Sequence, residues 1–258
     1  MTNNEILFEI NGITKSYKEK GLFNKKIKRV LNDVSFSLKK GECLGIIGES
    51  GSGKSTLGRI LIGLEKPDSG EIKFQDKDIH KEANQISRKE LSIVFQDYFS
   101  SVNPRFKVAD IIAEPLKLNT NLSENELRKE LEKLILDVGL KVEFLDRYAH
   151  ELSGGQLQRV CIARAISTKP KFIMLDEAVS SLDISTQVEV LNLLQDLKKT
   201  YSLSYIFVTH DLLTLTYICD SVIFFKEGKI IEKIDSLEKL CEVENDYSKS
   251  LLDAVIEF

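Results

Sequence analysis

The stretch "GESGSGKST", residues 48–56, restricts the possible folds of this chain more than any other part of it. It follows the apolar run "ECLGIIG", which is typical of a buried strand, and it leads into "STLGRILIGL", which has the pattern of a helix. Glycine, lysine and serine occupy the fixed positions of the pattern G-x-x-x-x-G-K-[ST]. A strand, a glycine-rich loop and a helix in this order predict an α/β domain that binds phosphate groups.

This loop offers three kinds of phosphate contact. The glycines let backbone N–H groups close around the phosphates, Lys54 reaches the β- and γ-phosphates, and the Ser55 hydroxyl ligates Mg²⁺. A flexible glycine turn is the alternative, which the strand and the helix on either side disfavour. The residues predicted to bind the nucleotide here are Gly48, Glu49, Ser50, Gly51, Ser52, Gly53, Lys54, Ser55 and Thr56.

The composition is that of an ordinary globular chain. Its 258 residues are enough for one large domain or a core with an inserted subdomain, and its formal net charge of −4 gives no bias toward a nucleic-acid partner. The four cysteines lack CxxC spacing, which favours apolar packing in a reducing compartment over a metal site. We expect neither a signal peptide nor a membrane-spanning helix, because no apolar run approaches the roughly 20 residues needed to span a bilayer.

Short apolar runs alternate with helical patterns along most of the chain. The runs "ILFEI", "VLNDVSFSL", "LSIVFQ", "KFIML", "SYIFVTH" and "SVIFFKEGKIIEK" indicate strands, and "ISTQVEVLNLLQDLKK" indicates a helix. This alternation predicts an α/β fold with a mostly parallel sheet.

A helical segment interrupts the alternation from about residue 99 to residue 149. Within it, "SENELRKELEKLILDVGL" combines a capping box, Ser123 with Glu126, with one apolar face. We therefore expect a helical subdomain of about residues 99–160, inserted into a single domain of residues 5–240 that is followed by a short C-terminal tail, residues 241–258.

The segment "KEKGLFNKKIKR", residues 18–29, is expected to connect two strands. A solvated hairpin tip is the simpler interpretation, and contact with anionic lipid headgroups is the alternative. Its basic residues are Lys18, Lys20, Lys25, Lys26, Lys28 and Arg29.

Two adjacent carboxylates end the apolar run "KFIMLDE". At the end of a buried strand, Asp176 is placed to hold Mg²⁺ directly or through water, and Glu177 to act as the base that polarises the attacking water. Acidic residues also end buried strands for no catalytic reason, and alone that would be the better interpretation. A phosphate loop in the same chain favours the catalytic one.

Three more side chains are candidates because of their places in the chain. Gln96 and His210 each follow a buried strand, and His210 is expected to contact the γ-phosphate and position the water. Tyr17 is expected to stack on an adenine. Each has a structural alternative: a surface glutamine, a hydrogen-bonded strand-end histidine and a half-buried aromatic ring. His80 and His150 keep the structural interpretation.

The stretch "ELSGGQLQRVCIARA" opens a second helix with a small polar turn. The free N–H groups and the dipole of such a helix start attract anions, so this turn is a second candidate phosphate contact. The order Tyr17, "GESGSGKST", Gln96, "LSGGQ", "IMLDE", "SLD" and His210 resembles the ATP-binding subunit of an ATP-binding cassette (ABC) transporter, over about residues 5–235. "LSGGQ" after a helical insertion and shortly before "LDE" is the most specific part of the resemblance.

The resemblance implies a P-loop NTPase (RecA-like) core with an antiparallel β N-terminal part and an inserted ABC α-helical subdomain. It also implies two subunits that meet head to tail, with each ATP between the phosphate loop of one and the "LSGGQ" of the other, so that ATP controls closure. Ser55, Gln96 and Asp176 would hold the Mg²⁺. The residues implied to contact the partner's ATP are Ser153, Gly154, Gly155, Gln156 and Asp183.

A finer resemblance concerns the transported substrate. "FQDYFSSVNPRFKV", the N-terminal insertion and "LDEAVSSLD" are similar to the ABC ATPases of nickel, metallophore and peptide importers, although peptide-type members often have a proline at the position of Ala178. We expect little of the C-terminal extension that larger members of this group carry.

The importer group implies several partners and a location. The partners are a second, related but different ATP-binding subunit, two transmembrane permease subunits and an extracytoplasmic substrate-binding protein. The chain would lie on the cytoplasmic face of the cell membrane as a peripheral subunit. The alternatives are an ABC ATPase of another transporter group, a nucleic-acid-associated ABC ATPase and a small-molecule P-loop kinase.

Overall fold

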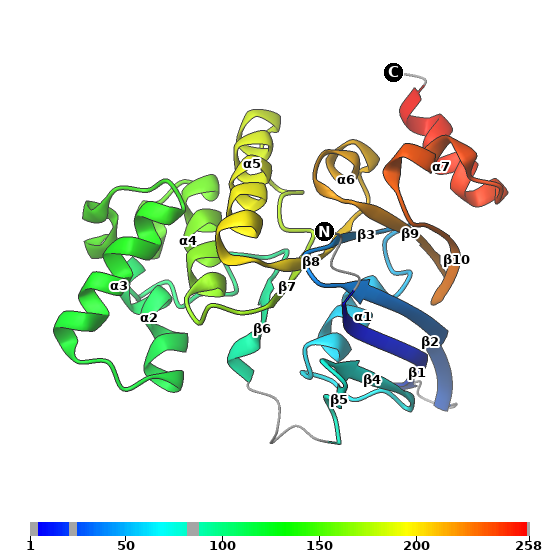
Figure 1. Ribbon diagram of the computed structural model, residues 1–258, viewed down its shortest axis with the longest axis horizontal. Coiled ribbons are helices and arrows are strands. Elements are labelled where there is room, and N and C mark those ends of the chain that lie inside the picture. The colour runs from blue at the N-terminus through cyan, green and yellow to red at the C-terminus, as the bar shows by residue number, and fades with distance from the viewer. Residues whose placement is uncertain (1–4, 21–24, 82–87, 257–258) are drawn as a thin grey trace. The chain divides into compact units, whose positions relative to one another are not determined.

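Figure 1 shows the computed structural model of the chain, which describes residues 5–20, 25–81 and 88–256. The chain separates into two compact units. The first unit comprises residues 1–87 and 204–258, and the second comprises residues 88–203. The helical segment expected at residues 99–160 lies within the second unit, which also contains two strands and a further helix.

The first unit contains a four-stranded antiparallel sheet in the order β2-β1-β4-β5. Its strands have one buried face because apolar residues alternate with polar ones. Phe8 and Phe74 face each other across β1 and β4, with ring centroids 4.9 Å apart. The antiparallel N-terminal part is thereby confirmed, and β4 and β5 are additions that the sequence analysis did not predict. The strands are β1 (Ile6–Lys20), β2 (Lys25–Lys39), β4 (Ser69–Phe74) and β5 (Lys77–Asp78).

The prediction that residues 18–29 form a connection was wrong in extent. β1 continues to Lys20, β2 begins at Lys25, and Lys18 pairs with Ile27 in the antiparallel ladder. These strands were missed because their residues are mainly basic and not apolar. A two-stranded ribbon that is exposed to water needs no apolar face. Lys18, Lys28 and Arg29 are exposed, whereas the side chains of Lys20, Lys25 and Lys26 lie outside the described part of the chain.

A second group of strands in the first unit has β3 between β8 and β9, and both neighbours run parallel to β3. Every residue of β3 and β8 is buried, as the continuous apolar runs predict. Helix α6 packs close to β3, and a Cβ atom on Gly45 would lie 2.6 Å from Leu215 Cδ1. The elements are β3 (Cys43–Ile47), α1 (Lys54–Leu61), β8 (Ser204–Thr209), α6 (Leu212–Ile218), β9 (Ser221–Lys226) and β10 (Lys229–Ile234), which is antiparallel to β9.

The second unit pairs two parallel strands, β6 and β7, and carries the helices drawn in green and yellow in Figure 1. The predicted capping box is present at the start of α3, where the Ser123 side chain accepts from the Glu126 N–H. Gly139, with φ of 74°, follows the end of this helix. The elements are β6 (Leu91–Val94), α2 (Val108–Asn119), α3 (Glu124–Asp137), α4 (Gly154–Ile166), β7 (Phe172–Asp176) and α5 (Ile184–Tyr201), with 3-10 turns Arg88–Glu90, Val142–Asp146 and Ala149–Glu151.

The last residues of the first unit form structure that the sequence analysis did not specify. After β10 come a 3-10 helix, Leu237–Glu242, and helix α7, Asp246–Ile256. Backbone N–H groups of Glu244 and Asn245 donate to the Glu232 carboxylate on β10, at 2.8 and 3.3 Å. The residues ahead of α7 are therefore tied to the neighbouring strand.

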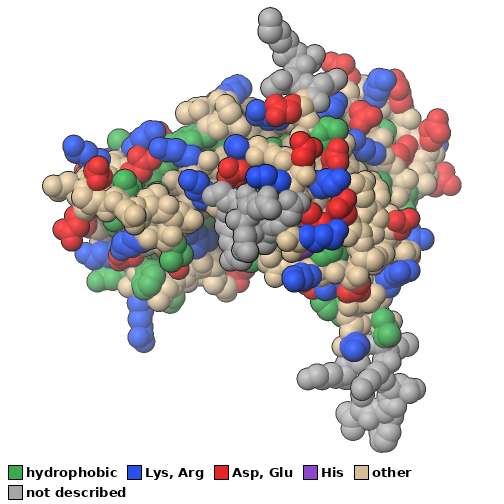
Figure 2. All heavy atoms as spheres, turned by 60° about the horizontal axis from the view of Figure 1, so that its bottom comes forward, with side chains coloured by type: hydrophobic (Ala, Val, Ile, Leu, Met, Phe, Trp, Pro, Cys, Tyr) green, Lys and Arg blue, Asp and Glu red, His purple; other side chains and the backbone are tan. Residues whose placement is uncertain are grey.

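Several general features accompany this fold. Within residues 5–20, 25–81 and 88–256, no helix has the length and apolar character needed to cross a membrane. On the face drawn in Figure 2, Lys and Arg side chains lie among Asp and Glu side chains.

The cysteines within the described residues do not form a metal site. Cys43, Cys161 and Cys219 are buried, and Cys241 is exposed. The described residues contain no group of three or more His, Cys, Asp or Glu side chains arranged to hold a metal ion.

Candidate functional site

The phosphate loop of the first unit closes around its own lysine. Gly51 and Gly53 have φ values of 78° and 110°, a left-handed conformation that glycine adopts without strain. The Lys54 ammonium is buried and donates to the carbonyl oxygens of Gly48 and Glu49, at 2.6 and 2.8 Å. These two hydrogen bonds hold Lys54 against the first residues of the loop, directly after the end of β3.

The turn between β9 and β10 braces the outside of this loop. The Gly228 N–H donates to the Ser52 carbonyl oxygen at 2.8 Å. A Cβ atom on Gly48 would lie 1.9 Å from the Phe225 carbonyl oxygen, so only glycine fits there. The sequence analysis missed this support because the contacts run through backbone atoms far apart in the chain, and such contacts leave no side-chain pattern.

Helix α7 also reaches the phosphate loop. The Tyr247 hydroxyl accepts a hydrogen bond from the Glu49 N–H at 3.3 Å, and the Lys226 ammonium lies 4.5 Å from the centre of the Tyr247 ring. Burial raises the pKa of Tyr247, so its hydroxyl is neutral at pH 7. The sequence analysis treated this region as a tail, and no motif there indicated a contact with the loop.

His210 lies at the same edge of the sheet as the phosphate loop. Residues Ile47 and Thr209 are register partners in the parallel strands β3 and β8, and the loop and His210 follow them directly. His210 is exposed. Because the carboxyl ends of parallel strands meet at one edge, the first unit brings this histidine and the loop together.

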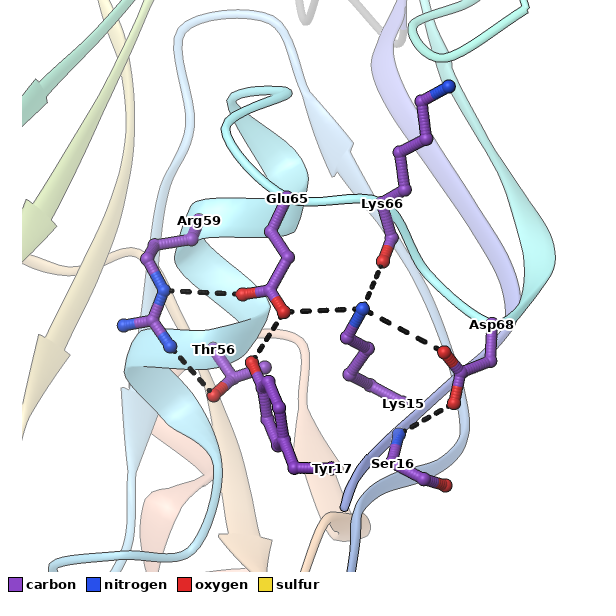
Figure 3. A network of polar contacts seen from close by, with 8 residues as sticks. All are labelled: Lys15, Ser16, Tyr17, Thr56, Arg59, Glu65, Lys66 and Asp68. Atoms are coloured by element: carbon purple, nitrogen blue, oxygen red, sulfur yellow. Dashed lines mark hydrogen bonds and ion pairs between the residues drawn. The ribbon is translucent and has the colours of Figure 1, made fainter. Parts of the chain in front are cut away.

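The Tyr17 side chain comes from β1 and is half-buried beside helix α1 (Figure 3). Its hydroxyl donates to Glu65 Oε1 at 2.6 Å. Glu65 lies in the turn after α1 and also contacts Arg59, whose guanidinium donates to the Thr56 hydroxyl at 3.1 Å. Sequence analysis identified Tyr17 but not Glu65 or Arg59, because neither belongs to a recognised motif.

In the second unit, the structure brings Gln96 and Glu177 together. Gln96 follows β6, Glu177 follows β7, and the Gln96 amide donates to Glu177 Oε2 at 2.8 Å. Glu177 has a φ of 47°, which is unusual for a residue with a side chain and costs on the order of 1 kcal/mol. Six other non-glycine residues of the described chain share this left-handed conformation, among them Glu227 with the same φ, so it is the hydrogen bond with Gln96 that sets Glu177 apart. Asp176 is the last residue of β7 and is buried.

The residues after Glu177 are held by α4 and α5. The Gln158 side chain is fully buried and donates to the Ala178 carbonyl oxygen at 2.6 Å. From α5, the Gln187 amide donates to the Val179 carbonyl oxygen at 2.9 Å. Gln158 therefore ties the helix that follows "LSGGQ" to the residue beside Glu177, a connection that the sequence analysis did not predict.

The "LSGGQ" stretch forms the start of α4. Ser153 is the N-cap, and its capping box is completed by Gln156, whose side-chain oxygen accepts from the Ser153 N–H at 3.0 Å. The two glycines allow close packing: a Cβ on Gly154 would lie 2.6 Å from the Tyr98 hydroxyl, and one on Gly155 would lie 2.4 Å from Thr186 Cγ2.

Asp183 is the N-cap of α5. Its carboxylate accepts from the Ser185 hydroxyl at 2.5 Å, and from the Thr186 N–H and hydroxyl at 3.0 and 2.7 Å. Led by the Ser185 hydroxyl, these donors hold the pKa of Asp183 far below its usual range. The residue is therefore ionised at pH 7 and already has local partners within its own helix.

The predicted site residues thus form two groups, one within each unit. The phosphate loop, Tyr17 and His210 belong to the first, and Gln96, Asp176, Glu177, Ser153–Gln156 and Asp183 belong to the second. The second unit also has a cavity of about 610 Å³, lined by Leu116, Leu122 and four lysines among other residues. None of the predicted site residues lines that cavity.

Comparison with known proteins decides the family. A family model described as "ABC transporter" matches residues 31–180, more than half of the chain. This protein belongs to the ABC transporter family. The matched region includes the phosphate loop, "LSGGQ" and Glu177, so ATP binding and ATPase activity of the ABC type follow from membership.

Individual ABC proteins support the assignment along most of the chain. The metal-staphylopine import system ATP-binding protein CntF of Staphylococcus aureus is 41% identical over 252 residues, covering 98% of this chain and 100% of the relative. The oligopeptide transport ATP-binding protein OppF of Haemophilus influenzae is 42% identical, covering 98% of this chain and 79% of the relative.

Solved ABC structures have the same fold. The ATP-binding cassette MJ0796, in a dimeric post-hydrolysis state bound to ADP and Pi, matches with a TM-score of 0.78 and 29% identity, covering 88% of this chain and 97% of that one. CbiO1 from Clostridium perfringens, part of an ABC transporter complex, matches with a TM-score of 0.79 and 29% identity over 92% of both chains. The predicted P-loop NTPase fold class is therefore confirmed.

Proposed function

We propose that this ABC ATPase is the ATP-hydrolysing subunit of a multi-subunit importer of metal–chelate complexes, nickel, or di- and oligopeptides. The observation that carries the proposal is the similarity, over 98% of the chain, to ATP-binding proteins of a metal-staphylopine import system and an oligopeptide transport system. ATP binding and hydrolysis would then supply the free energy for transport.

The catalytic roles follow from the chemistry of the residues. We assign Lys54 and the loop N–H groups to the phosphates, and Glu177 to the attacking water as general base. The Gln96 hydrogen bond supports this assignment, because it orients the Glu177 carboxylate. His210, at the end of β8, is assigned to the γ-phosphate and the water.

Each unit offers oxygen atoms of the kind that Mg²⁺ prefers as ligands, and the ion remains partly hydrated when bound. Ser55 and Gln96 offer a hydroxyl and an amide oxygen, and Asp176 offers a carboxylate directly or through water. When bound, Mg²⁺ would neutralise charge on the β- and γ-phosphates. The assignment of these three residues rests on their types and their places in the motifs.

We further propose that a second subunit completes the site through "LSGGQ" and Asp183. The start of α4 presents N–H groups and a helix dipole suited to an anion, and its capping box leaves the Ser153 side chain at the helix end. The solved dimer of MJ0796 with ADP and Pi is consistent with nucleotide binding in a dimeric cassette. Asp183 would lie beside the partner's nucleotide while retaining its capping contacts.

Ser153→Arg tests this arrangement. The isolated subunit should bind ATP with unchanged affinity, because Ser153 contacts the partner's nucleotide and not its own. The assembled complex should lose ATPase activity by about 100-fold or more, which is typical when a group that stabilises the transition state is removed. Nucleotide affinity of the subunit and ATPase rate of the complex are the two measurements.

The matched control is Ser123→Arg. Ser123 caps α3 with the same φ and ψ as Ser153, −65° and 162°, and with the same kind of capping box. Both variants lose a cap, at a cost of about 1 kcal/mol of stability. If Ser153→Arg and Ser123→Arg complexes hydrolyse ATP equally fast, Ser153 acts only as a helix cap and the shared site is wrong.

The remaining partners are also proposals. We expect a related but different second ATP-binding subunit, two transmembrane permease subunits and, through the complex, an extracytoplasmic substrate-binding protein. The chain would be held at the cytoplasmic face of the membrane by the permeases.

The substrate class can be tested with the assembled complex in membranes. Binding proteins loaded with a peptide, with nickel or with a metal–chelator complex are added in turn, and ATPase rates are compared with those of the unloaded binding proteins. We expect one of the three ligand classes to stimulate hydrolysis. Equal rates with loaded and unloaded binding proteins in all three cases would contradict the importer function while leaving the ATPase assignment intact.

A further inference from the structure

The Glu65 carboxylate is the centre of the contacts around Tyr17. Its Oε1 accepts from the Tyr17 hydroxyl at 2.6 Å and lies 3.2 Å from the Lys15 ammonium, and its Oε2 lies 3.4 Å from Arg59 Nε. The Glu65 and Lys15 side chains are 21% and 14% exposed, so these contacts are better shielded from water than an ordinary surface ion pair. Figure 3 shows all three donors directed at the one carboxylate.

The charge of Glu65 fixes the direction of its hydrogen bond with Tyr17. Partial burial opposes ionisation, but the hydrogen bonds from Tyr17 and Lys15 and the charge of Lys15 hold the pKa of Glu65 below its usual value. The group is therefore ionised at pH 7. An ionised carboxylate can only accept, so the Tyr17 hydroxyl must donate to it, and this defines where the ring points.

The Glu65 carboxylate is also connected to the phosphate loop, through Arg59. Arg59 contacts Glu65 through Nε and donates through Nη2 to the Thr56 hydroxyl at 3.1 Å. Thr56 is buried in the first turn of α1, within the "GKST" end of the loop motif. A continuous series of side chains therefore connects the Tyr17 ring with the helix that starts at the phosphate loop.

We infer that Glu65 is a positioning residue for the nucleotide base. It holds the Tyr17 ring in the orientation needed for stacking, and through Arg59 it fixes the position of that ring relative to the phosphate loop. The inference rests on the proposed stacking of Tyr17 on adenine. A ring that is already ordered loses little freedom when the base arrives, whereas an unheld ring must be ordered at the expense of affinity.

The contacts of Asp68 provide an internal comparison. Asp68 Oδ1 lies 3.7 Å from the same Lys15 ammonium, and Oδ2 accepts from the Ser16 N–H at 2.7 Å. It therefore belongs to the same set of polar contacts but reaches the strand backbone and not the tyrosine hydroxyl. Loss of Asp68 removes a charge from this region without releasing the ring.

The test measures the affinity of the full chain for two probes, ATP and inorganic tripolyphosphate, each with Mg²⁺. Glu65→Ala should weaken ATP binding about 2- to 10-fold, the cost of ordering one side chain, and should leave tripolyphosphate binding unchanged. Tyr17→Ala should weaken ATP binding more, by about 5- to 150-fold, since it removes base stacking altogether. Asp68→Ala should change neither affinity.

Two further variants separate positioning from general stability. Tyr17→Phe keeps the ring but loses the hydroxyl, so it should match Glu65→Ala, and combining the two should add no further loss. Glu65→Gln keeps an acceptor for the tyrosine and should fall between Glu65→Ala and the unmodified chain. Thermal unfolding of each variant shows whether the fold is intact.

The outcomes distinguish the inference from the proposal beneath it. If Tyr17→Ala weakens ATP binding but Glu65→Ala does not, the stacking stands and the positioning role of Glu65 is overturned. If Glu65→Ala weakens ATP and tripolyphosphate equally, Glu65 acts on the loop and not on the base, which also overturns it. If Tyr17→Ala leaves ATP affinity unchanged, the stacking itself is wrong and the inference fails with it.

Discussion

Glu177→Gln is expected to bind ATP normally and to hydrolyse it about 100- to 10,000-fold more slowly, the usual contribution of a general base. The glutamine side chain has the same shape, and its amide oxygen can still accept from Gln96, so the hydrogen bond that measures 2.8 Å with Glu177 should remain. What it lacks is the carboxylate that we propose takes a proton from the water. The measurements are single-turnover hydrolysis by the assembled complex and ATP affinity.

The same variant should accumulate a closed dimer in ATP, because in the proposed arrangement the γ-phosphate bridges the two subunits and would no longer be removed. Size-exclusion chromatography with and without ATP reports this change. Glu114→Gln is a suitable control, since Glu114 is an exposed residue on α2 of the same unit. Turnover by Glu177→Gln at the wild-type rate would show that another group is the base.

The sequence predicted the ends of the buried strands well, and the candidate residues were found because they stand at those ends. Continuous apolar runs identified β3, β7 and β8, and the polar residue after each run was then an evident candidate. Glu177 and His210 were found in this way, whereas Gln96 follows β6, a strand expected to be buried whose residues are mostly half-buried. The capping box predicted at Ser123 is equally local, since Ser123 and Glu126, three residues further on, define it.

The supports of the site could not be predicted because they depend on contacts between distant parts of the chain. Glu65 has no special neighbours in sequence, and its importance appears only when β1 brings Tyr17 to it. The Phe225 carbonyl oxygen that excludes a side chain at Gly48 is a backbone atom, which no residue type reveals. The φ of 47° at Glu177 is also invisible in sequence, since the usual signal for that conformation is glycine.

Lys54→Ala is expected to weaken ATP binding about 10- to 100-fold. The lysine ammonium, now bonded to the carbonyl oxygens of Gly48 and Glu49, is placed to donate to the phosphates as well. A hydrogen bond to a charged group contributes about 1.5–3 kcal/mol, and each 1.4 kcal/mol corresponds to tenfold in affinity. The variant also leaves two loop carbonyls without this donor, so the loop should lose its compact form. Equilibrium binding of ATP to the full chain measures the effect.

Lys40→Ala is the matched control, because it changes the net charge of the same unit by the same amount. Lys40 is 43% exposed and pairs with Glu5 at 3.1 Å, in the turn between β2 and β3, at the opposite end of β3 from the loop motif. An equal loss of affinity in both variants would mean that only the overall charge matters. Undiminished ATP affinity in Lys54→Ala, with the fold intact by thermal unfolding, would refute the phosphate-loop assignment. A loss confined to Lys54→Ala, together with normal binding by Glu177→Gln, would separate the residue that holds the nucleotide from the residue that cleaves it.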